Sequence, residues 1–135
     1  MELENKNILI LKAIDKSNEA VESAEENYLN KHYETCQNRL YYAIFYIVNA
    51  LAYKDNFITS KHAQLMGWFN KKYIYDDKIF ESRLFAIYKE AYTYRQLSDY
   101  DFMYKPDVDE LLMLIKDTKY FISVIKKYLN GKFLI

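Results

Sequence analysis

Glycine and proline are scarce in this chain, which has two Gly and one Pro among 135 residues. A multi-stranded sandwich or barrel needs many tight turns, which are built largely from these residue types. Too few glycines are present for the loops that cradle nucleotide phosphates. Because 51% of the residues are hydrophobic, a disordered chain is excluded as well. The sequence therefore predicts an all-α protein with short polar connections between its helices.

Length and charge limit the organisation further. A chain of this size buries about two thirds of its unfolded surface, so we expect one domain over residues 1–135 without disulfides or metals. Nineteen basic and nineteen acidic residues give a net charge of zero. This balance argues against a broad nucleic-acid footprint but permits a local cationic site.

The composition also indicates where the protein acts. Cys36 is the single cysteine, which excludes an internal disulfide and fits a reducing compartment. The longest uncharged run, residues 40–53, is too short to cross a bilayer. No secretory signal is recognisable at the N-terminus. We therefore expect a cytoplasmic protein that does not associate with membranes.

Apolar residues that recur with helical spacing predict an up-and-down bundle of four to five helices. The Asp107 to Glu110 segment, which follows Pro106, is a capping arrangement that opens the last helix. The expected elements are helices over 3–28 and 33–53, a short third helix capped by Thr59 or Ser60 and ending near Tyr73, a fourth capped by Asp76 or Asp77 that includes Phe80 and reaches Arg95, and a fifth that ends before Gly131.

Two of these helices carry informative apolar patterns. In the first, the residues expected to face the core are Leu11, Ile14, Val21, Ala24 and Tyr28. The second is apolar on almost every side, so it should be buried on almost every side. Its apolar surface is larger than a five-helix monomer readily covers, which predicts self-association, with a homodimer as the simplest case.

Metal and cofactor chemistry finds little support. A di-iron bundle needs paired Glu-x-x-His motifs, but Leu29 and Thr59 lie three residues before His32 and His62. His32 and Cys36 could share a helix face, yet two ligands do not complete a zinc site. We therefore expect neither a metal nor a cofactor.

The fifteen tyrosines permit two interpretations. Aromatic rings beside cations can stack on the bases of single-stranded nucleic acid. Most of these tyrosines, however, fall at helical spacing beside aliphatic residues, as Tyr42, Tyr46, Tyr88 and Tyr92 do. That pattern indicates core or interface packing first.

Arg95 is a cation on a face that otherwise points to the core, seven residues after Tyr88 and four after Ala91. A buried unpaired cation is costly, so Arg95 needs a partner or must line a cleft. Asp99 is one helical turn further on and could form a structural ion pair with it. Alternatively, the guanidinium could receive a phosphate bidentately.

Three separate motifs resemble the HEPN domain (higher eukaryotes and prokaryotes nucleotide-binding), in its small prokaryotic branch with an R-x-x-x-D-Y signature. The likeness extends over residues 20–129. The motifs are Asn38-Arg39-Leu40-Tyr41-Tyr42-Ala43-Ile44-Phe45, then Ser60-Lys61-His62, then Tyr94-Arg95-Gln96-Leu97-Ser98-Asp99-Tyr100.

The resemblance implies a dimerising helical bundle in which the arginine motifs of two subunits share a cleft. Many members are metal-independent ribonucleases, often toxins neutralised by a small nucleotidyltransferase. In those enzymes a histidine follows the arginine after four to six residues. The arginine would stabilise charge on the scissile phosphate, and the histidine would move the proton of the 2′-hydroxyl. RNA or nucleotide contacts would then come from Arg95, Tyr94 and Tyr100.

This sequence lacks that histidine, because Tyr100 follows the four residues after Arg95 and no His occurs beyond His62. The remaining candidate bases are Asp99, Tyr100 and His62. Asp99 would be weakly basic beside Arg95, and Tyr100 is normally protonated. His62 either supports the start of its helix or the core, or joins the site if the fold brings it near Arg95.

Three functions stay open. The first is an RNA-acting, toxin-like protein with metal-independent ribonuclease activity. The second is a non-catalytic module that holds a nucleotide or a nucleotidyltransferase, with a tyrosine near the motif accepting a nucleotidyl group. The third is an oligomerisation domain in which Arg95 and Asp99 pair structurally, so that replacing Arg95 would cost about 3–5 kcal/mol of stability.

Overall fold

The structure is a computed structural model that describes residues 3–133. Its elements are α1 (Leu3–Leu29), α2 (Tyr33–Lys54), α3 (His62–Phe69), the π-helical segment η1 (Asn70–Asp76), α4 (Ser82–Tyr100) and α5 (Val108–Phe133). No strand occurs within this described range. The predicted all-α bundle is therefore confirmed.

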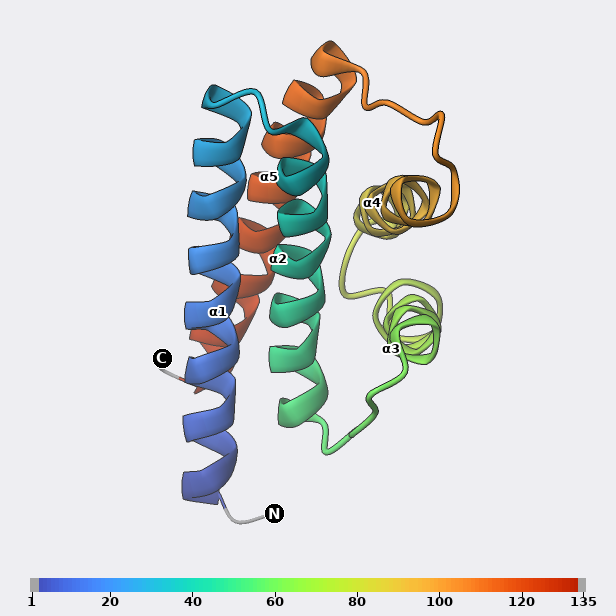
Figure 1. Ribbon diagram of the computed structural model, residues 1–135. Coiled ribbons are helices and arrows are strands. Elements are labelled where there is room, and N and C mark those ends of the chain that lie inside the picture. The colour runs from blue at the N-terminus through green and yellow to red at the C-terminus, as the bar shows by residue number, and fades with distance from the viewer. Residues whose placement is uncertain (1–2, 134–135) are drawn as a thin grey trace.

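α1 and α2 lie side by side, and α5 packs behind both of them in the view of Figure 1. We call these three helices the first layer. α1 and α2 run antiparallel, and the short turn between them places Lys31 at a φ of 62°. The aliphatic side chains of α2 are fully buried between the other elements, including Leu40, Ile44 and Ile47. Burying each such side chain contributes about 1.5–3 kcal/mol to stability. Because its side chains are buried by the elements around it, α2 is the central helix of the fold.

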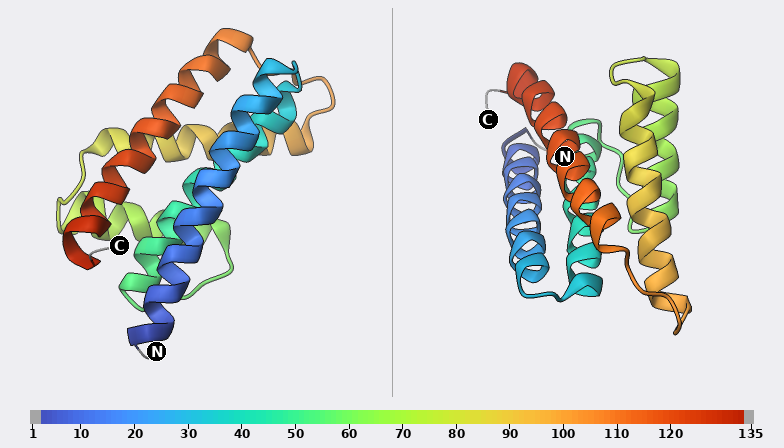
Figure 2. Two further views of the ribbon diagram at one scale, coloured as in Figure 1. Left: turned by 90° about the vertical axis from the view of Figure 1, so that its left-hand side faces the viewer. Right: turned by 90° about the horizontal axis from the view of Figure 1, so that it is seen from above.

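α3 and α4 form a second layer on α2 and cross the first layer at a steep angle (Figures 1 and 2). Five buried rings connect this layer to α5, with neighbouring centroids 5.4–6.1 Å apart. They are Phe69, Tyr73, Phe80, Tyr88 and Phe121. Each aromatic pair adds about 0.5–1.5 kcal/mol beyond area burial. This ring cluster fixes the end of α3 and η1 relative to the beginning of α4.

Two helices begin at residues that differ from the sequence prediction. α3 begins after Lys61, and the Thr59 hydroxyl accepts a hydrogen bond from the Lys61 N–H instead of capping the helix. α4 begins at Ser82 and not after Asp76 or Asp77, which lie at the end of η1. Consequently Phe80 is buried in the connection before α4.

At its beginning α5 matches the prediction, and at its end it does not. The Asp107 carboxylate accepts the N–H of Glu110 at 2.9 Å, which is the expected N-cap bond. The helix continues through Gly131 to Phe133, whereas the sequence predicted an end before Gly131. A glycine weakens a helix interior by only about 1 kcal/mol and does not have to end it.

The burial pattern confirms α2 and corrects α1. Eleven α2 residues are buried, as expected for a helix that is apolar on nearly every side. In α1, Leu11 is 46% exposed, and Ile10 occupies the core position instead. None of the helices in the described part of the chain is long and apolar enough to span a membrane.

Candidate functional site

Arg95 lies at the edge of the core, on the buried face of α4. Leu84, Tyr88 and Ala91 on the same face are fully buried, whereas the Arg95 side chain is 23% exposed. Its guanidinium carbon lies 4.9 Å from the centre of the Tyr41 ring and 5.3 Å from that of Tyr42. The two rings of α2 therefore stabilise the cation by cation–π attraction.

His62, the first residue of α3, meets Arg95 at this point. Its Nδ1 lies 3.3 Å from an Arg95 terminal nitrogen and 2.7 Å from the Tyr41 hydroxyl. The imidazole stacks on Phe45 with centroids 4.3 Å apart and the planes tilted by 14°. Three helices thus place an imidazole beside a guanidinium, which sequence reasoning left undecided.

The contacts define the protonation state of His62. A guanidinium only donates hydrogen bonds, so Nδ1 must accept and the ring proton lies on Nε2. Burial lowers the pKa of His62 below 6.5, and the positive charge of Arg95 lowers it further. The imidazole is therefore neutral at pH 7, which is the form of a general base.

Asp99 lies one turn after Arg95 and forms a loose ion pair with it. Its carboxylate oxygen is 3.6 Å from Arg95 Nε, which exceeds hydrogen-bond range. Among the described residues, the buried Nε has no hydrogen-bond partner. The Asp99 side chain is 47% exposed, and such exposed pairs contribute about 0–1 kcal/mol. The buried carboxylate required for a strong structural pair is therefore absent from this position.

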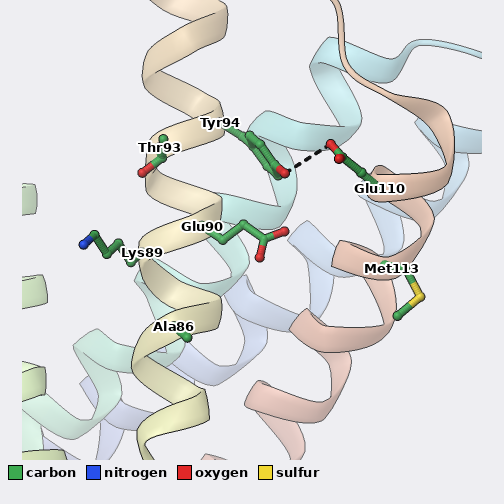
Figure 3. A pocket seen from close by; sticks show the side chains of 7 residues that line it. All are labelled: Ala86, Lys89, Glu90, Thr93, Tyr94, Glu110 and Met113. Atoms are coloured by element: carbon green, nitrogen blue, oxygen red, sulfur yellow. Dashed lines mark hydrogen bonds between the residues drawn. The ribbon is translucent and has the colours of Figure 1, made fainter.

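The other two residues predicted for the site do not meet His62. Tyr94 points from α4 toward α5 (Figure 3), where its hydroxyl donates to Glu110 at 3.2 Å. Burial raises the pKa of Tyr94 to about 12, and the charges of Glu90 and Glu110 add to this effect. Tyr100 ends α4 and is 84% exposed.

Tyr94 belongs to an open groove of about 480 Å³ between α4 and α5 (Figure 3). Burial raises the pKa of Glu90 in this groove, and the nearby charges of Asp117 and Glu110 raise it further. The groove is thus acidic, and its lining residues are Ala86, Lys89, Glu90, Thr93, Tyr94, Glu110 and Met113.

The residues with metal-binding potential do not assemble into a site. No group of three or more His, Cys, Asp or Glu side chains suited to a metal occurs in the described part of the chain. Cys36 is fully buried, and burial raises the pKa of its thiol to about 12, with Glu25 adding to the shift. The Cys36 thiol is therefore protonated and unreactive at neutral pH.

Sequence reasoning did not assign the aromatic wall of the site. Tyr41 bonds His62, Tyr42 lies against Arg95, and Phe45 stacks on the imidazole. Arg39 approaches the same Tyr42 ring, with its guanidinium carbon 5.5 Å from the centroid. The available signal was that these rings lie together on α2, beside its aliphatic seam.

This fold and site define a class of protein: a helical bundle in which an arginine and a histidine meet beside aromatic rings of the central helix. The model of the HEPN domain matches residues 10–128, and the chain therefore belongs to the HEPN domain family. The family predicted from the three motifs is confirmed.

Curated relatives agree with this assignment. Two proteins of Methanocaldococcus jannaschii, each named "Putative toxin", are 33% and 32% identical to this chain. The first alignment covers 90% of this chain and 82% of the relative, and the second covers 82% and 86%. A UPF0332 protein of Thermotoga maritima is 25% identical, over 85% of this chain and 86% of the relative.

Proposed function

We propose that this protein is a toxin-like HEPN protein that binds single-stranded RNA and cleaves it without a metal ion. Arg95 binds the scissile phosphate, and His62 accepts the proton of the 2′-hydroxyl. The observation that carries the proposal is the 3.3 Å approach of His62 Nδ1 to Arg95. The family membership and the toxin-named relatives support it.

Arg95 has the properties of a phosphate-binding group. Its charge does not depend on pH in the physiological range, and its planar guanidinium matches two phosphate oxygens. The Tyr41 and Tyr42 rings lie within 5.3 Å of the guanidinium carbon and offer no carboxylate that would compete for its N–H groups. Because Asp99 lies beyond hydrogen-bond range of Nε, it competes only weakly with an incoming phosphate.

His62 completes the reaction after Arg95 engages the phosphate. Arg95 then releases Nδ1, which takes the ring proton and donates to the Tyr41 hydroxyl oxygen. Nε2 is left free to accept the 2′-hydroxyl proton. The 2′ oxygen attacks phosphorus, and the bond from phosphorus to the 5′ oxygen breaks. The 5′ oxygen takes a proton from a water molecule, and the hydroxide so formed takes from Nε2 the proton that His62 had gained. The products are a 2′,3′-cyclic phosphate and a 5′-hydroxyl.

The remaining predicted residues take secondary roles in this proposal. Asp99 orients Arg95 through the ion pair, and the exposed Tyr100 contacts RNA beyond the scissile phosphate. Tyr94 lies in the α4–α5 groove and contacts RNA only if the strand extends past the end of α4. Residues 1–135 act as one domain, and cellular RNA as substrate implies a cytoplasmic site of action.

The decisive experiment is cleavage of labelled total RNA by the purified protein in EDTA. Arg95→Ala and His62→Gln should each abolish cleavage while the protein stays folded. Arg83→Ala, on the same helix and exposed, and His32→Gln, the other histidine and also exposed, are matched controls that should cleave normally. Cleavage that survives Arg95→Ala would refute the proposed role of Arg95.

A non-catalytic binding module is the second candidate function. The observation in its favour is that both donors on His62 Nδ1 hold the ring in the tautomer that cannot accept at Nε2. Under this alternative the site holds a nucleotide or a nucleotidyltransferase partner. The parent protein would then cleave no RNA. In addition, either a nucleotide would raise its melting temperature or a nucleotidyltransferase would co-purify with it.

Self-association belongs to the proposal, but its surface differs from the expected one. The structure covers α2, which was expected to drive dimerisation. Large apolar side chains are instead exposed at the end of α4 and just after it, at Leu97, Tyr100, Phe102 and Met103. A homodimer formed there would bring two Arg95 sites near each other. Light scattering of the parent protein and of Phe102→Glu tests this: the parent should be a dimer and the variant a monomer. A parent protein that is monomeric at micromolar concentration would contradict the proposal.

A further inference from the structure

Two adjoining grooves lie along α1 and α2, outside the Arg95 site. Lys16 and Tyr46 line both of them, and we call the two together the α1–α2 groove. The first part has a volume of about 410 Å³ and is lined by Leu9, Lys12, Ala13, Lys16, Phe45, Tyr46, Asn49, Tyr53 and Thr59. The second has about 330 Å³ and is lined by Lys16, Glu19, Ala20, Ser23, Arg39 and Tyr46.

The α1–α2 groove is cationic in a protein of zero net charge. Its charged lining residues are Lys12, Lys16 and Arg39, with Glu19 as the single acid among them. The groove between α4 and α5 has the opposite character, since Glu90 and Glu110 outnumber its one lysine. The charges are thus segregated, and the α1–α2 groove is complementary to a polyanion.

Aromatic rings accompany these cations. The Lys16 ammonium lies 5.5 Å from the centre of the half-buried Tyr46 ring. Phe45 and Tyr53 add two further half-buried rings to the lining. Cations that follow a backbone, beside rings that stack on bases, are the combination with which proteins bind single-stranded nucleic acid.

The α1–α2 groove continues into the Arg95 site through shared rings. Phe45 lines the groove and also stacks on His62, at 4.3 Å. Tyr46 lies 5.8 Å from Tyr42, and Tyr42 is the ring that the Arg95 guanidinium contacts. These ring contacts place the α1–α2 groove beside the Arg95 site, within reach of a strand that has a phosphate at Arg95.

We propose that the α1–α2 groove binds the single-stranded RNA segment that flanks the phosphate held by Arg95. Lys12 and Lys16 neutralise backbone phosphates, and the Tyr46 ring stacks on a base. This inference rests on the proposed function, because Arg95 defines where the strand enters. It extends that function by assigning a second binding site, in which the bases of the single strand are free to stack.

The test is the binding of a fluorescein-labelled, 2′-O-methyl single-stranded RNA of about twelve nucleotides, followed by anisotropy. The methyl group blocks the 2′-hydroxyl, so binding is measured without cleavage. The groove variant is Lys12→Ala with Lys16→Ala, and its matched control is Lys116→Ala with Lys127→Ala on α5. All four lysines are exposed, and alanine is a good helix former, so both double variants should fold normally.

The salt dependence of binding gives the expected magnitude. Each phosphate contact contributes about 0.7 to the slope of log affinity against log salt for single strands. Losing two contacts should reduce the magnitude of the slope by about 1.4. When the salt concentration is raised fourfold, the factor by which affinity falls should therefore be about sevenfold smaller for the groove variant than for the parent protein. The control double variant should keep the parent slope. A groove variant with the slope and affinity of the parent would overturn the inference.

Two further variants separate this inference from the proposed function. Tyr46→Leu keeps an apolar side chain but removes the stacking face, and should weaken binding about fivefold or more. Loss of affinity in Arg95→Ala with no change in either groove variant would refute the groove and leave the proposed function intact. Loss in the groove variants with no change in Arg95→Ala would support the groove and refute the role of Arg95.

Discussion

Tyr88→Phe and Tyr41→Phe remove the same atom from two fully buried side chains, and the structure predicts opposite effects on stability. The Tyr88 hydroxyl has no hydrogen-bond partner in the described structure and lies in a ring packed against Phe69 and Phe121. The Tyr41 hydroxyl is 2.7 Å from His62 Nδ1. The first substitution therefore removes an unsatisfied polar group, and the second breaks a hydrogen bond of the candidate site.

The magnitudes follow from the cost of burying polar groups. An unsatisfied buried hydroxyl costs about 1–3 kcal/mol, so Tyr88→Phe should raise the free energy of unfolding by about 1 kcal/mol or more. A satisfied hydrogen bond contributes about 0.5–1.5 kcal/mol net, so Tyr41→Phe should lower the same quantity by about 1 kcal/mol. The two variants should therefore differ by about 2 kcal/mol or more.

Urea unfolding followed by helical circular dichroism measures this difference, with equal slopes for all three proteins as the sign of a common unfolding reaction. The melting temperatures should move in opposite directions, by about 2–6 °C each. A Tyr88→Phe variant less stable than the parent would refute the reasoning, since it would mean that the hydroxyl is satisfied. Equal destabilisation by both substitutions would have the same meaning.

Three other predictions concern the site and the fold. Arg95→Ala removes the positive charge that adds to the effect of burial in lowering the pKa of His62. In an NMR titration this pKa should therefore rise, while burial keeps it below 6.5. An unchanged or lower pKa would contradict the prediction. Because unfolded His62 binds a proton more readily than the folded residue, stability should fall as the pH drops below 6.5, and His62→Gln should reduce that loss in urea unfolding. Asp107→Ala removes the N-cap of α5 and should cost about 0.5–2 kcal/mol by urea unfolding, and no loss of stability would contradict it.

Local chemistry explains which boundaries the sequence predicted. Asp107 caps α5 because a carboxylate that precedes an apolar periodic run can bond the first free N–H groups without help from the rest of the fold. Asp76 and Asp77 precede a similar run, but they pair with Lys71 and Lys72 of η1. Packing of Phe80 in the ring cluster delays α4 to Ser82, and this tertiary effect leaves no local signature in the sequence.

The candidate site was predicted in part for the same reason. Helical spacing placed Arg95 on the buried face of α4 and Asp99 one turn away, because both relations lie within one helix. The contact of Arg95 with His62 joins α4 to α3 and depends on how both helices cross α2. Single-sequence periodicity carries no information on that crossing. For this reason His62 and the Tyr41 hydroxyl could be placed only by the structure.

The position of His62 makes the site a property of packing between the layers. α3 has eight residues, fewer than an isolated helix needs for stability. It is held by the buried side chains of Leu65 and Phe69 and by the bond from His62 to Tyr41. An opening that releases α3 would separate His62 from Arg95 while α1, α2 and α5 keep their contacts with one another. The activity proposed for this site should therefore be lost on heating before the helical signal of the whole bundle disappears.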